Sequence, residues 1–395
     1  MSSEIDGSTP DVVVVGGGIG GLASALALTL GGRRARVLEQ SAEFGEVGAG
    51  LQMAPNATRI LRSWGVLDEV VDRGVLPRRL VMRDALDGTE LTHLDLADAE
   101  RRFGAPYVVI HRSDLHAILL AACRAAGVEL VTDTTVRDVE IGADQAVAVS
   151  AGRRDTGRLV LAADGLGSVL RTRLSDDEPV SSAYVAYRGT VPMDQLADSA
   201  DLALDDVVVY IGPHCHMVQY PLRRGEIFNQ VAVFRSPRAL AGQPDWGTPD
   251  ELDAAFAGTC AAVRAGLPNL WRDRWWRMYD RQPIGRWVDR RLALTGDSAH
   301  PMLQYLAQGA CQAIEDADGL AALVGKHGGP DGPDWDAALT DYNDVRTVRT
   351  ARVQRTARDW GDLWHCDGLF RSVRNELLRD RDPHDYRHLD WLYGE

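Results

Sequence analysis

Short apolar runs alternate with helix-like segments over the first part of the chain. Residues 11–15 are mostly valine, residues 22–30 are rich in alanine and leucine, and residues 35–38 form a second apolar run. This alternation is typical of a parallel sheet covered by helices. Short apolar runs at 159–163 and 291–295 have the same character, and we expect them to belong to the same β/α region.

The pattern changes in the middle of the chain, between about residues 180 and 282. Tight-turn sequences there separate four β-rich stretches, at residues 183–191, 206–211, 214–221 and 227–234. Short strands joined by tight turns favour an antiparallel sheet. Helical patterns return at about 309–324 and over 335–378. The β/α region is therefore predicted to be interrupted by an inserted sheet.

A glycine-rich turn joins the first apolar run to the first helix. Its spacing is Gly16-x-Gly18-x-x-Gly21, and Glu39 follows the next apolar run. Glycine lets the backbone turn tightly and approach a pyrophosphate, which the free N–H groups and the positive dipole end of the helix then attract. An acid at the position of Glu39 accepts hydrogen bonds from a ribose diol and disfavours a 2′-phosphate. The turn is predicted to bind FAD or NAD rather than NADP; the alternative is an ordinary glycine turn.

Composition narrows the class of protein. The 395 residues include 43 Lys and Arg against 57 Asp and Glu, a formal net charge of −14. This charge argues against nucleic acid or an anionic membrane as the main partner, and no apolar run is long enough to cross a membrane. The five cysteines are scattered and lack CxxC spacing, so neither a metal site nor a disulfide framework is expected. The N-terminus has no features of a secretory signal, and we expect a cytoplasmic protein.

Two further motifs follow in a fixed order. The first is Asp164-Gly165 with Ser168 and Arg171, and the second spans residues 294–301. Together with the glycine turn, they resemble the motifs of the single-component flavoprotein aromatic hydroxylases, the para-hydroxybenzoate hydroxylase-like group. The resemblance covers nearly the whole chain. It implies an α/β fold with a Rossmann-like FAD-binding domain, an inserted antiparallel-sheet substrate domain and C-terminal helices.

The resemblance gives the two domains a definite extent. The expected FAD-binding domain is discontinuous and comprises residues 11–84, 105–180 and 283–330. The substrate-binding sheet domain is expected at residues 85–104 and 181–282, and a C-terminal helical segment at 331–395. A plain nicotinamide dehydrogenase usually keeps its nucleotide domain contiguous, so this arrangement counts against that class.

Cofactor contacts are implied for residues of these motifs. In the family, the aspartate matching Asp297 binds the FAD ribitol, the one matching Asp164 supports FAD and the nicotinamide donor, and the arginine matching Arg112 contacts the phosphates. A guanidinium suits a pyrophosphate because its planar fork donates two parallel hydrogen bonds. The expected cofactor-binding residues are Gly16, Gly18, Gly21, Glu39, Gln52, Arg112, Asp164, Asp297, Gly309 and Ala310. For Asp164 and Asp297 the alternative is a turn or a helix cap, and for the helix that starts near Gly309 it is ordinary packing.

The neighbouring sequence is similar to the branch of the family that hydroxylates 3-hydroxybenzoate. The stretches that carry this similarity include residues 44–52, 106–107, 111–116, 186–190, 210–213, 219–222, 300–307 and 360–368. The similarity implies that NADH and O2 are consumed, that a C4a-hydroperoxyflavin hydroxylates the ring para to the phenol, and that gentisate (2,5-dihydroxybenzoate) is formed. It also implies a homodimer.

Four positions depart from the residues expected in close relatives: Ser298, Met302, Gln308 and Cys311. They flank the expected pocket, so salicylate or a larger phenolic compound is the alternative substrate. Alternatives from other classes are a flavin-binding sensor without turnover and a reductase that inserts no oxygen.

Candidate catalytic groups lie on the stretch 214–221. Side chains alternate along a strand, so His216, Val218 and Tyr220 are expected to share one face. Histidine can accept a phenol proton near neutral pH, and the resulting phenolate is the better nucleophile. By resemblance, the catalytic residues are His216 and Gln304, and the substrate-binding residues are Tyr107, Tyr187 and Tyr220. The alternatives are a core histidine bonded to backbone, a packing role for Tyr220, and a loop-stabilising amide for Gln304.

Overall fold

The computed structural model describes residues 9–45, 48, 50–196, 204–330 and 332–394. Two expectations concern residues outside these ranges. The expected lack of a secretory signal concerns the N-terminus, where residues 1–8 lie outside the described part, and the similarity over 44–52 includes residues 46, 47 and 49.

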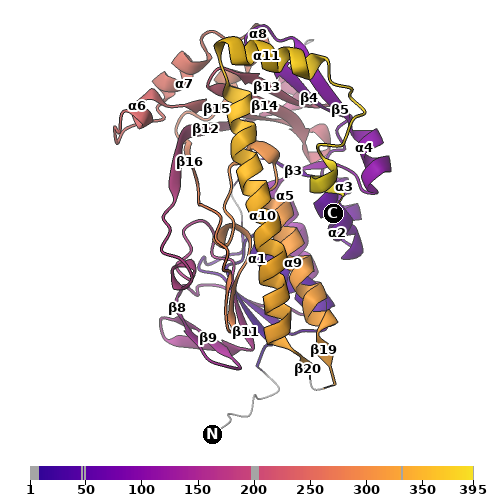
Figure 1. Cartoon of the computed structure of the whole chain (residues 1–395), viewed down its shortest axis with the longest axis vertical. Coiled ribbons are helices and arrows are strands. Elements are labelled where there is room, and N and C mark those ends of the chain that lie inside the picture. Colours follow the sequence, from indigo (N-terminus) through magenta and orange to yellow (C-terminus); the bar gives the residue numbers. More distant parts are fainter. Residues whose placement is uncertain (1–8, 46–47, 49, 197–203, 331, 395) are drawn as a thin grey trace.

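A six-stranded sheet forms the lower half of the molecule in Figure 1. Its order is β17 (Val288–Asp289), β18 (Leu292–Leu294), β11 (Leu159–Ala162), β1 (Val12–Val15), β2 (Ala35–Leu38) and β7 (Glu129–Val131). Every neighbouring pair runs parallel except β17–β18. The four valines of β1 are buried on both faces of the sheet, which is why this strand reads as a continuous apolar run. The expected parallel sheet is confirmed.

Helices cover this sheet on one side. Helix α1 (Ile19–Leu30) contacts both α5 (Arg112–Ala126) and α9 (Gly309–Lys326). A three-stranded sheet, which the sequence pattern did not predict, consists of β8 (Val136–Ile141), β9 (Ala146–Ser150) and β10 (Arg153–Gly157). Its strand β9 contacts β11. Short elements complete this half: α2 (Pro55–Ser63), α3 (Leu67–Arg73), β3 (Gly50–Met53), β6 (Val108–His111) and the hairpin β19 (Gly328–Gly329) and β20 (Gly332–Pro333).

A seven-stranded sheet forms the upper half. Its order is β16 (Trp276–Asp280), β12 (Val180–Pro192), β15 (Ile227–Arg235), β14 (Cys215–Leu222), β13 (Val207–Gly212), β4 (Arg79–Asp84) and β5 (Glu90–Asp95). Neighbours are antiparallel except the parallel pair β13–β4. The outer face is packed by α7 (Pro249–Phe256) and α8 (Ala261–Gly266), near α6 (Pro237–Leu240).

The position of β4 corrects one predicted boundary. We expected residues 11–84 to belong to the FAD-binding domain, but Arg79–Asp84 pairs with Val207–Ile211 in the seven-stranded sheet. The first crossing between the halves therefore precedes residue 79. Alternation between strands and helices cannot locate this crossing, because a strand that leaves one sheet for another keeps the same local pattern.

One long helix joins the two halves (Figure 1). Helix α10 (Trp335–His365) has 31 residues, which corresponds to about 46 Å at the helical rise of 1.5 Å per residue. It packs on α9 in the lower half and reaches β13 and β14 in the upper half. Helix α11 (Gly368–Arg379) then contacts β5, and α12 (Asp390–Tyr393) lies near α2, while α4 (Leu96–Phe103) follows β5.

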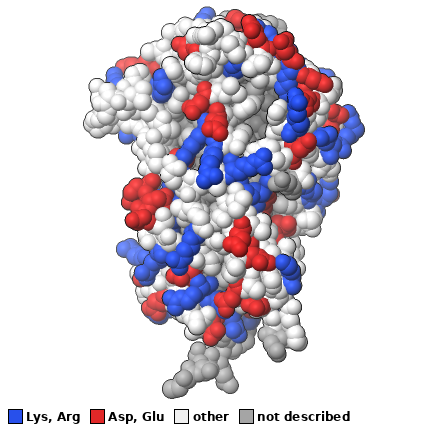
Figure 2. Space-filling view, viewed as in Figure 1, with Lys and Arg blue, Asp and Glu red and all other residues white. Residues whose placement is uncertain are grey.

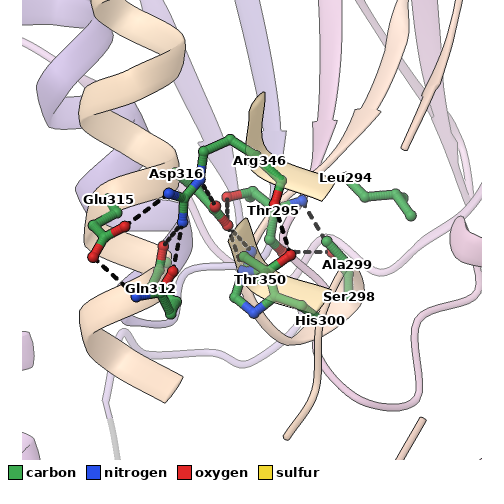
Figure 3. Close-up of polar contacts among 12 residues, drawn as sticks. Leu294, Thr295, Ser298, Ala299, His300, Gln312, Glu315, Asp316, Arg346 and Thr350 are labelled. Atoms are coloured by element: carbon green, nitrogen blue, oxygen red, sulfur yellow. Dashed lines mark hydrogen bonds and ion pairs between the residues drawn. The ribbon is translucent and has the colours of Figure 1, made fainter. Parts of the chain in front are cut away.

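A buried polar cluster fastens α10 to α9 (Figure 3). Asp316 is fully buried; its carboxylate accepts hydrogen bonds from Arg346 Nε (2.7 Å), His300 Nε2 (2.6 Å) and Gly296 N–H (2.9 Å). Arg346 also donates to Glu315 Oε2 at 2.7 Å. Burial alone would raise the pKa of Asp316, but the charges of His300 and Arg346 hold that pKa well below its usual range. The cluster fixes the turn after β18 to the two helices.

Surface charge is mixed. On the face in Figure 2, basic and acidic side chains lie in small alternating patches. Ion pairs such as Arg358–Asp280 (2.7 Å) and Arg102–Asp390 (2.8 Å) join segments far apart in the sequence. Within the described residues, no helix is both long and apolar enough to cross a bilayer. The same residues contain no cluster of three or more His, Cys, Asp and Glu side chains placed to hold a metal ion.

The polar cluster predicts a large effect of removing its cation. Arg346→Met leaves the buried carboxylate of Asp316 without its main counter-ion, so the free energy of unfolding should fall by roughly 3–5 kcal/mol. Equilibrium urea unfolding measures this. The matched control is Arg355→Met on the exposed side of the same helix, where a change within about 0.5 kcal/mol is expected. Equal losses in the two variants would contradict the role given to the cluster.

Candidate active site

A cavity of about 800 Å³ lies between the glycine turn and the inner face of the seven-stranded sheet. Most of the expected site residues line it: Gly16, Gly18, Glu39, Gln52, Tyr107, Arg112, Asp164, His216, Tyr220, Asp297, Gln304, Gly309 and Ala310. They come from both halves of the chain, so folding brings together motifs far apart in the sequence. Gly21 and Tyr187 are not part of the lining.

The glycine turn leaves no room for side chains. Gly16 has φ +110°, and a Cβ there would lie 2.3 Å from the carbonyl oxygen of Ala163. A Cβ at Gly21 would lie 1.9 Å from the carbonyl oxygen of Gly16, so Gly21 acts behind the turn rather than in the cavity wall. Helix α1 starts after Gly18 without a side-chain cap. Its first N–H groups are therefore open to an anion, as pyrophosphate binding requires.

Glu39 is held at the edge of this turn. Its Oε2 accepts the N–H of Gly17 at 2.8 Å and its Oε1 accepts the N–H of Ser41 at 2.9 Å. Both bonds orient the carboxylate beside the helix N-terminus, where a ribose diol would lie. The turn, the open helix end and this acid together fit the adenosine diphosphate part of FAD.

Asp164 and Asp297 lie at the ends of neighbouring strands of the parallel sheet. Asp164 accepts from Ser168 Oγ at 2.5 Å and from the N–H of Val169 at 3.0 Å, so it caps its turn and also lines the cavity. Burial raises the pKa of Asp164. Asp297 lies in a single helical turn, Gly296–Ser298. The hydroxyl of Ser298 donates to the carbonyl of Ala162 on β11 at 2.5 Å, which fixes this turn against the sheet.

His216 stands on the inner face of β14. As the strand period predicts, Val218 and Tyr220 line the cavity with it, whereas Met217 packs into the outer core. The Nδ1 atom of His216 lies 2.8 Å from His365 Nε2. Burial lowers the pKa of His216 to about 3, so its ring is neutral at neutral pH. Its buried Nε2 has no hydrogen-bond partner among the described residues, so a ring nitrogen at the cavity wall is left for a ligand.

Two tyrosines and an amide line the same cavity as this histidine. The hydroxyl of Tyr107 donates to Gln52 Oε1 at 2.7 Å. Burial raises the pKa of Tyr107 and of Tyr220, so both hydroxyls keep their protons. The proton of Tyr107 is donated to Gln52, whereas that of Tyr220 can be donated to a substrate anion. Gln304 begins a short helical turn, Gln304–Leu306, just before α9.

The expected substrate contact of Tyr187 is corrected by the structure. Tyr187 is fully buried in the outer core of the seven-stranded sheet, where it stacks on Trp275 at 5.9 Å between ring centroids. Its hydroxyl donates to the carbonyl of Gly247 at 2.6 Å. Its neighbour Arg188 points to the other face and lines the cavity instead. The resemblance thus selected the right strand but a residue whose side chain lies on the wrong face of the sheet.

Sequence reasoning missed other residues of the lining. The guanidinium of Arg188 lies 5.1 Å over the ring of Trp276, and its Nε is buried. Arg188 pairs with Val231 on β15, and the side chains of paired residues lie on the same face of a sheet. Val231 could therefore have indicated that Arg188 faces the cavity. The cavity is also lined by four C-terminal residues, His388, Leu389, Leu392 and Tyr393. No local sequence pattern indicates this.

The four positions that depart from close relatives lie near the site in different ways. Met302 and Gln308 line the cavity, and Gln308 Oε1 accepts from Asn56 Nδ2 at 2.9 Å. Cys311 is fully buried, with Sγ 3.7 Å from the carbonyl oxygen of Gln52. Ser298 serves the turn of Asp297, as described above. Met302 and Gln308 are thus the two departures that can touch a ligand.

The glycine turn predicts loss of cofactor from a single added methyl group. Gly21→Ala places a Cβ against the carbonyl of Gly16 and must displace the turn, so the purified variant should contain little or no FAD. Flavin absorbance per protein, with circular dichroism to confirm folding, measures this. The control is Gly325→Ala near the end of α9, a glycine outside the cavity lining with nothing within 4 Å of its added Cβ and no left-handed backbone conformation. A Gly21→Ala protein with full flavin content would contradict the prediction.

Comparison with known proteins agrees with this geometry. The family described as FAD binding domain matches residues 9–357. The 3-hydroxybenzoate 6-hydroxylase of Polaromonas naphthalenivorans is 38% identical over 389 residues, covering 97% of this chain and 95% of the relative. That of Klebsiella oxytoca is 39% identical over 392 residues, covering 97% and 96%.

A solved structure has the same architecture. The chain superposes on a salicylate hydroxylase substrate complex with a TM-score of 0.79 and 26% identity, over 98% of this chain and 96% of the other. The family binds FAD, and NAD(P)H and O2 are its typical co-substrates. The chain therefore belongs to the FAD-binding aromatic hydroxylases and is an FAD-dependent aromatic monooxygenase.

Proposed function

We propose that the protein hydroxylates 3-hydroxybenzoate para to its hydroxyl group, using NADH and O2, and so forms 2,5-dihydroxybenzoate. The observation that carries this proposal is the neutral, buried His216, whose partnerless Nε2 lines a cavity that also contains two tyrosine hydroxyls. Such a wall suits a substrate with one phenol and one carboxylate. Relatives of that activity, aligned over nearly the whole chain, support the choice.

Each polar group has a part in this reaction. The Nε2 atom of His216 accepts the phenol proton, and the Gln304 amide donates a hydrogen bond to the resulting oxyanion. Tyr220 donates a hydrogen bond to the carboxylate, and Tyr107 does the same once its hydroxyl turns from Gln52 Oε1 to the substrate. A phenolate pushes electron density into the ring, which makes the para carbon a better nucleophile. General-base assistance of this kind is worth roughly 100- to 10,000-fold in rate.

FAD would be held by the glycine turn with Glu39, by Arg112 and by the turns of Asp164 and Asp297. When bound and reduced, it supplies the activated oxygen. The start of α9 at Gly309 turns its positive dipole end to the cavity, which favours negative charge on the reduced ring. Apolar side chains around His216, among them Tyr305 and Trp364, exclude water that would divert the oxidant.

A larger or differently substituted phenol is the second candidate. Met302 and Gln308 replace the residues expected in close relatives, and both line the cavity. The cavity also continues over Met82 and Thr92 towards Arg381, past the part that one benzoate would fill beside His216. The solved salicylate hydroxylase has the same fold, so salicylate is the first alternative to assay.

We also propose a homodimer in the cytoplasm. The homodimer rests on the family resemblance, and the location rests on the scattered free cysteines. Light scattering of the purified protein tests the first, and fractionation of cells tests the second.

The substrate assignment predicts a defined product. The FAD-loaded protein, mixed with NADH, air and 3-hydroxybenzoate, should form 2,5-dihydroxybenzoate in step with NADH loss, as chromatography of the quenched mixture measures. NADPH is the control donor, and salicylate is the control substrate. NADH loss that yields only hydrogen peroxide would overturn 3-hydroxybenzoate as the substrate, and product from salicylate alone would favour the alternative.

The role of His216 predicts uncoupling. His216→Ala removes the proton acceptor, so product per NADH should fall at least about tenfold, while FAD content stays unchanged because the glycine turn is untouched. Oxygen uptake with product analysis measures the coupling. The control is His327→Gln, which changes a histidine bonded to Asp341 at the far end of α9. Full coupling in His216→Ala would exclude the assigned role.

A further inference from the structure

His216 has a second histidine behind it. His365 is the last residue of α10, and its Nε2 lies 2.8 Å from His216 Nδ1. The two side chains are almost fully buried, with 1% and 4% of their surface exposed. The pair comes from elements far apart in the sequence, a strand of the inserted sheet and the helix that joins both halves.

Aromatic rings hold this pair in place. Tyr184 stacks on His365 with ring centroids 4.5 Å apart and an interplanar angle of 22°. Trp364 and Tyr305 meet the ring of His216 edge-on at 5.1 and 5.6 Å. Contacts with these three neighbouring rings leave the imidazoles little freedom to rotate, so the hydrogen bond between them is a fixed feature of the site.

If His216 acts as a base at the cavity, only one arrangement of protons on the two histidines is possible. One nitrogen of the pair must donate and the other must accept. If His216 Nε2 is to accept a substrate proton, its Nδ1 must already carry one, and His365 Nε2 must be the acceptor. The neutral His365 then carries its own proton on Nδ1.

We propose that His365 is a positioning residue that holds His216 in the Nδ1–H tautomer and takes over the Nδ1 proton when His216 accepts one from the substrate. This inference rests on the proposed function for the identity of the substrate proton. The proton balance is simple: the phenol O–H breaks and His216 Nε2–H forms, His216 Nδ1–H breaks and His365 Nε2–H forms, and His365 releases its Nδ1 proton to water. Reversal of these transfers returns a proton to the product oxygen.

The surroundings of His365 disfavour the protonated form of its ring. Burial lowers the pKa of His365 well below its usual range, and so do the charges of the groups that face it: His216 and His214 on the β13–β14 hairpin, Arg235 on β15 and Arg374 on α11. The negative dipole end of α10 acts in the opposite direction. Both rings are therefore neutral at neutral pH, which is the state that the arrangement of protons described above requires.

The turn of the β13–β14 hairpin lies against His365. The N–H of His214 donates to the carbonyl of His365 at 3.1 Å. His214 Nε2 lies 2.9 Å from Arg235 Nη2, and its side chain is half-buried. His365 is thus in contact with a half-buried residue of the hairpin turn.

Two substitutions separate positioning from proton transfer. In His365→Gln the amide oxygen can accept the His216 Nδ1–H but cannot pass a proton on, whereas His365→Phe keeps an aromatic ring against Tyr184 and removes both abilities. The tautomer of His216 is read by heteronuclear NMR of isotopically labelled histidine in the FAD-bound protein without substrate. We expect the Nδ1–H form in the wild type and in His365→Gln, and a mixture of tautomers in His365→Phe.

Ionisation of the substrate is read separately. Stopped-flow absorbance of bound 3-hydroxybenzoate reports phenolate formation, and its rate across a pH series should fall at least about tenfold in both variants. The dissociation constant, the FAD content and reduction by NADH should stay as in the wild type. His327→Gln is the matched control, a hydrogen-bonded histidine at the end of another helix and away from the cavity.

The outcomes distinguish this inference from the proposed function. An Nε2–H tautomer of His216 in the wild type, or a pure Nδ1–H form in His365→Phe, would overturn the positioning role whatever the substrate is. An unchanged ionisation rate in His365→Gln would overturn the relay. If the wild type does not ionise 3-hydroxybenzoate at all, the proposed substrate is wrong, while the tautomer measurement still decides the role of His365.

Discussion

The buried contact between Arg346 and Asp316 is the interaction on which the arrangement of the site depends. It fastens α10 to α9 and, through the N–H of Gly296, to the turn that carries Asp297. The same helix ends at His365 in the other half of the molecule. A rigid helix transmits position along its length, so one ion pair in its first half sets where the ring behind His216 comes to lie.

The two ends of the cavity follow different physical rules. At the glycine turn, backbone N–H groups and the absence of side chains make the site, because any Cβ at Gly16 or Gly21 would collide with backbone. At the inner sheet face, side chains make it, and burial shifts the pKa of His216 down and that of Tyr220 up until both are neutral. The cofactor end can therefore tolerate few substitutions, whereas the substrate end is the part where relatives can diverge.

Local sequence patterns predicted the helices and strands better than they predicted which parts of the molecule these elements pack against. The apolar runs located β1, β2, β11 and β18, and strand parity placed His216 and Tyr220 on the same side of β14. Tyr187 shows the limit of the resemblance, which implied a substrate contact for a side chain that is buried in the outer core of the sheet. The strand β4 shows another, since the pattern of residues 79–84 is equally suited to either sheet. His365 and the C-terminal residues reach the cavity through tertiary packing alone, which no periodicity records.

The interrupted order of the parallel sheet has a consequence for synthesis on the ribosome. Strand β18 pairs with β11, and α9 packs on α1, yet both are translated after the whole inserted sheet. The nascent chain thus exposes the glycine turn long before its partners have left the exit tunnel. Since His388, Leu389, Leu392 and Tyr393 also line the cavity, the flavin can be enclosed only after these residues have left the exit tunnel.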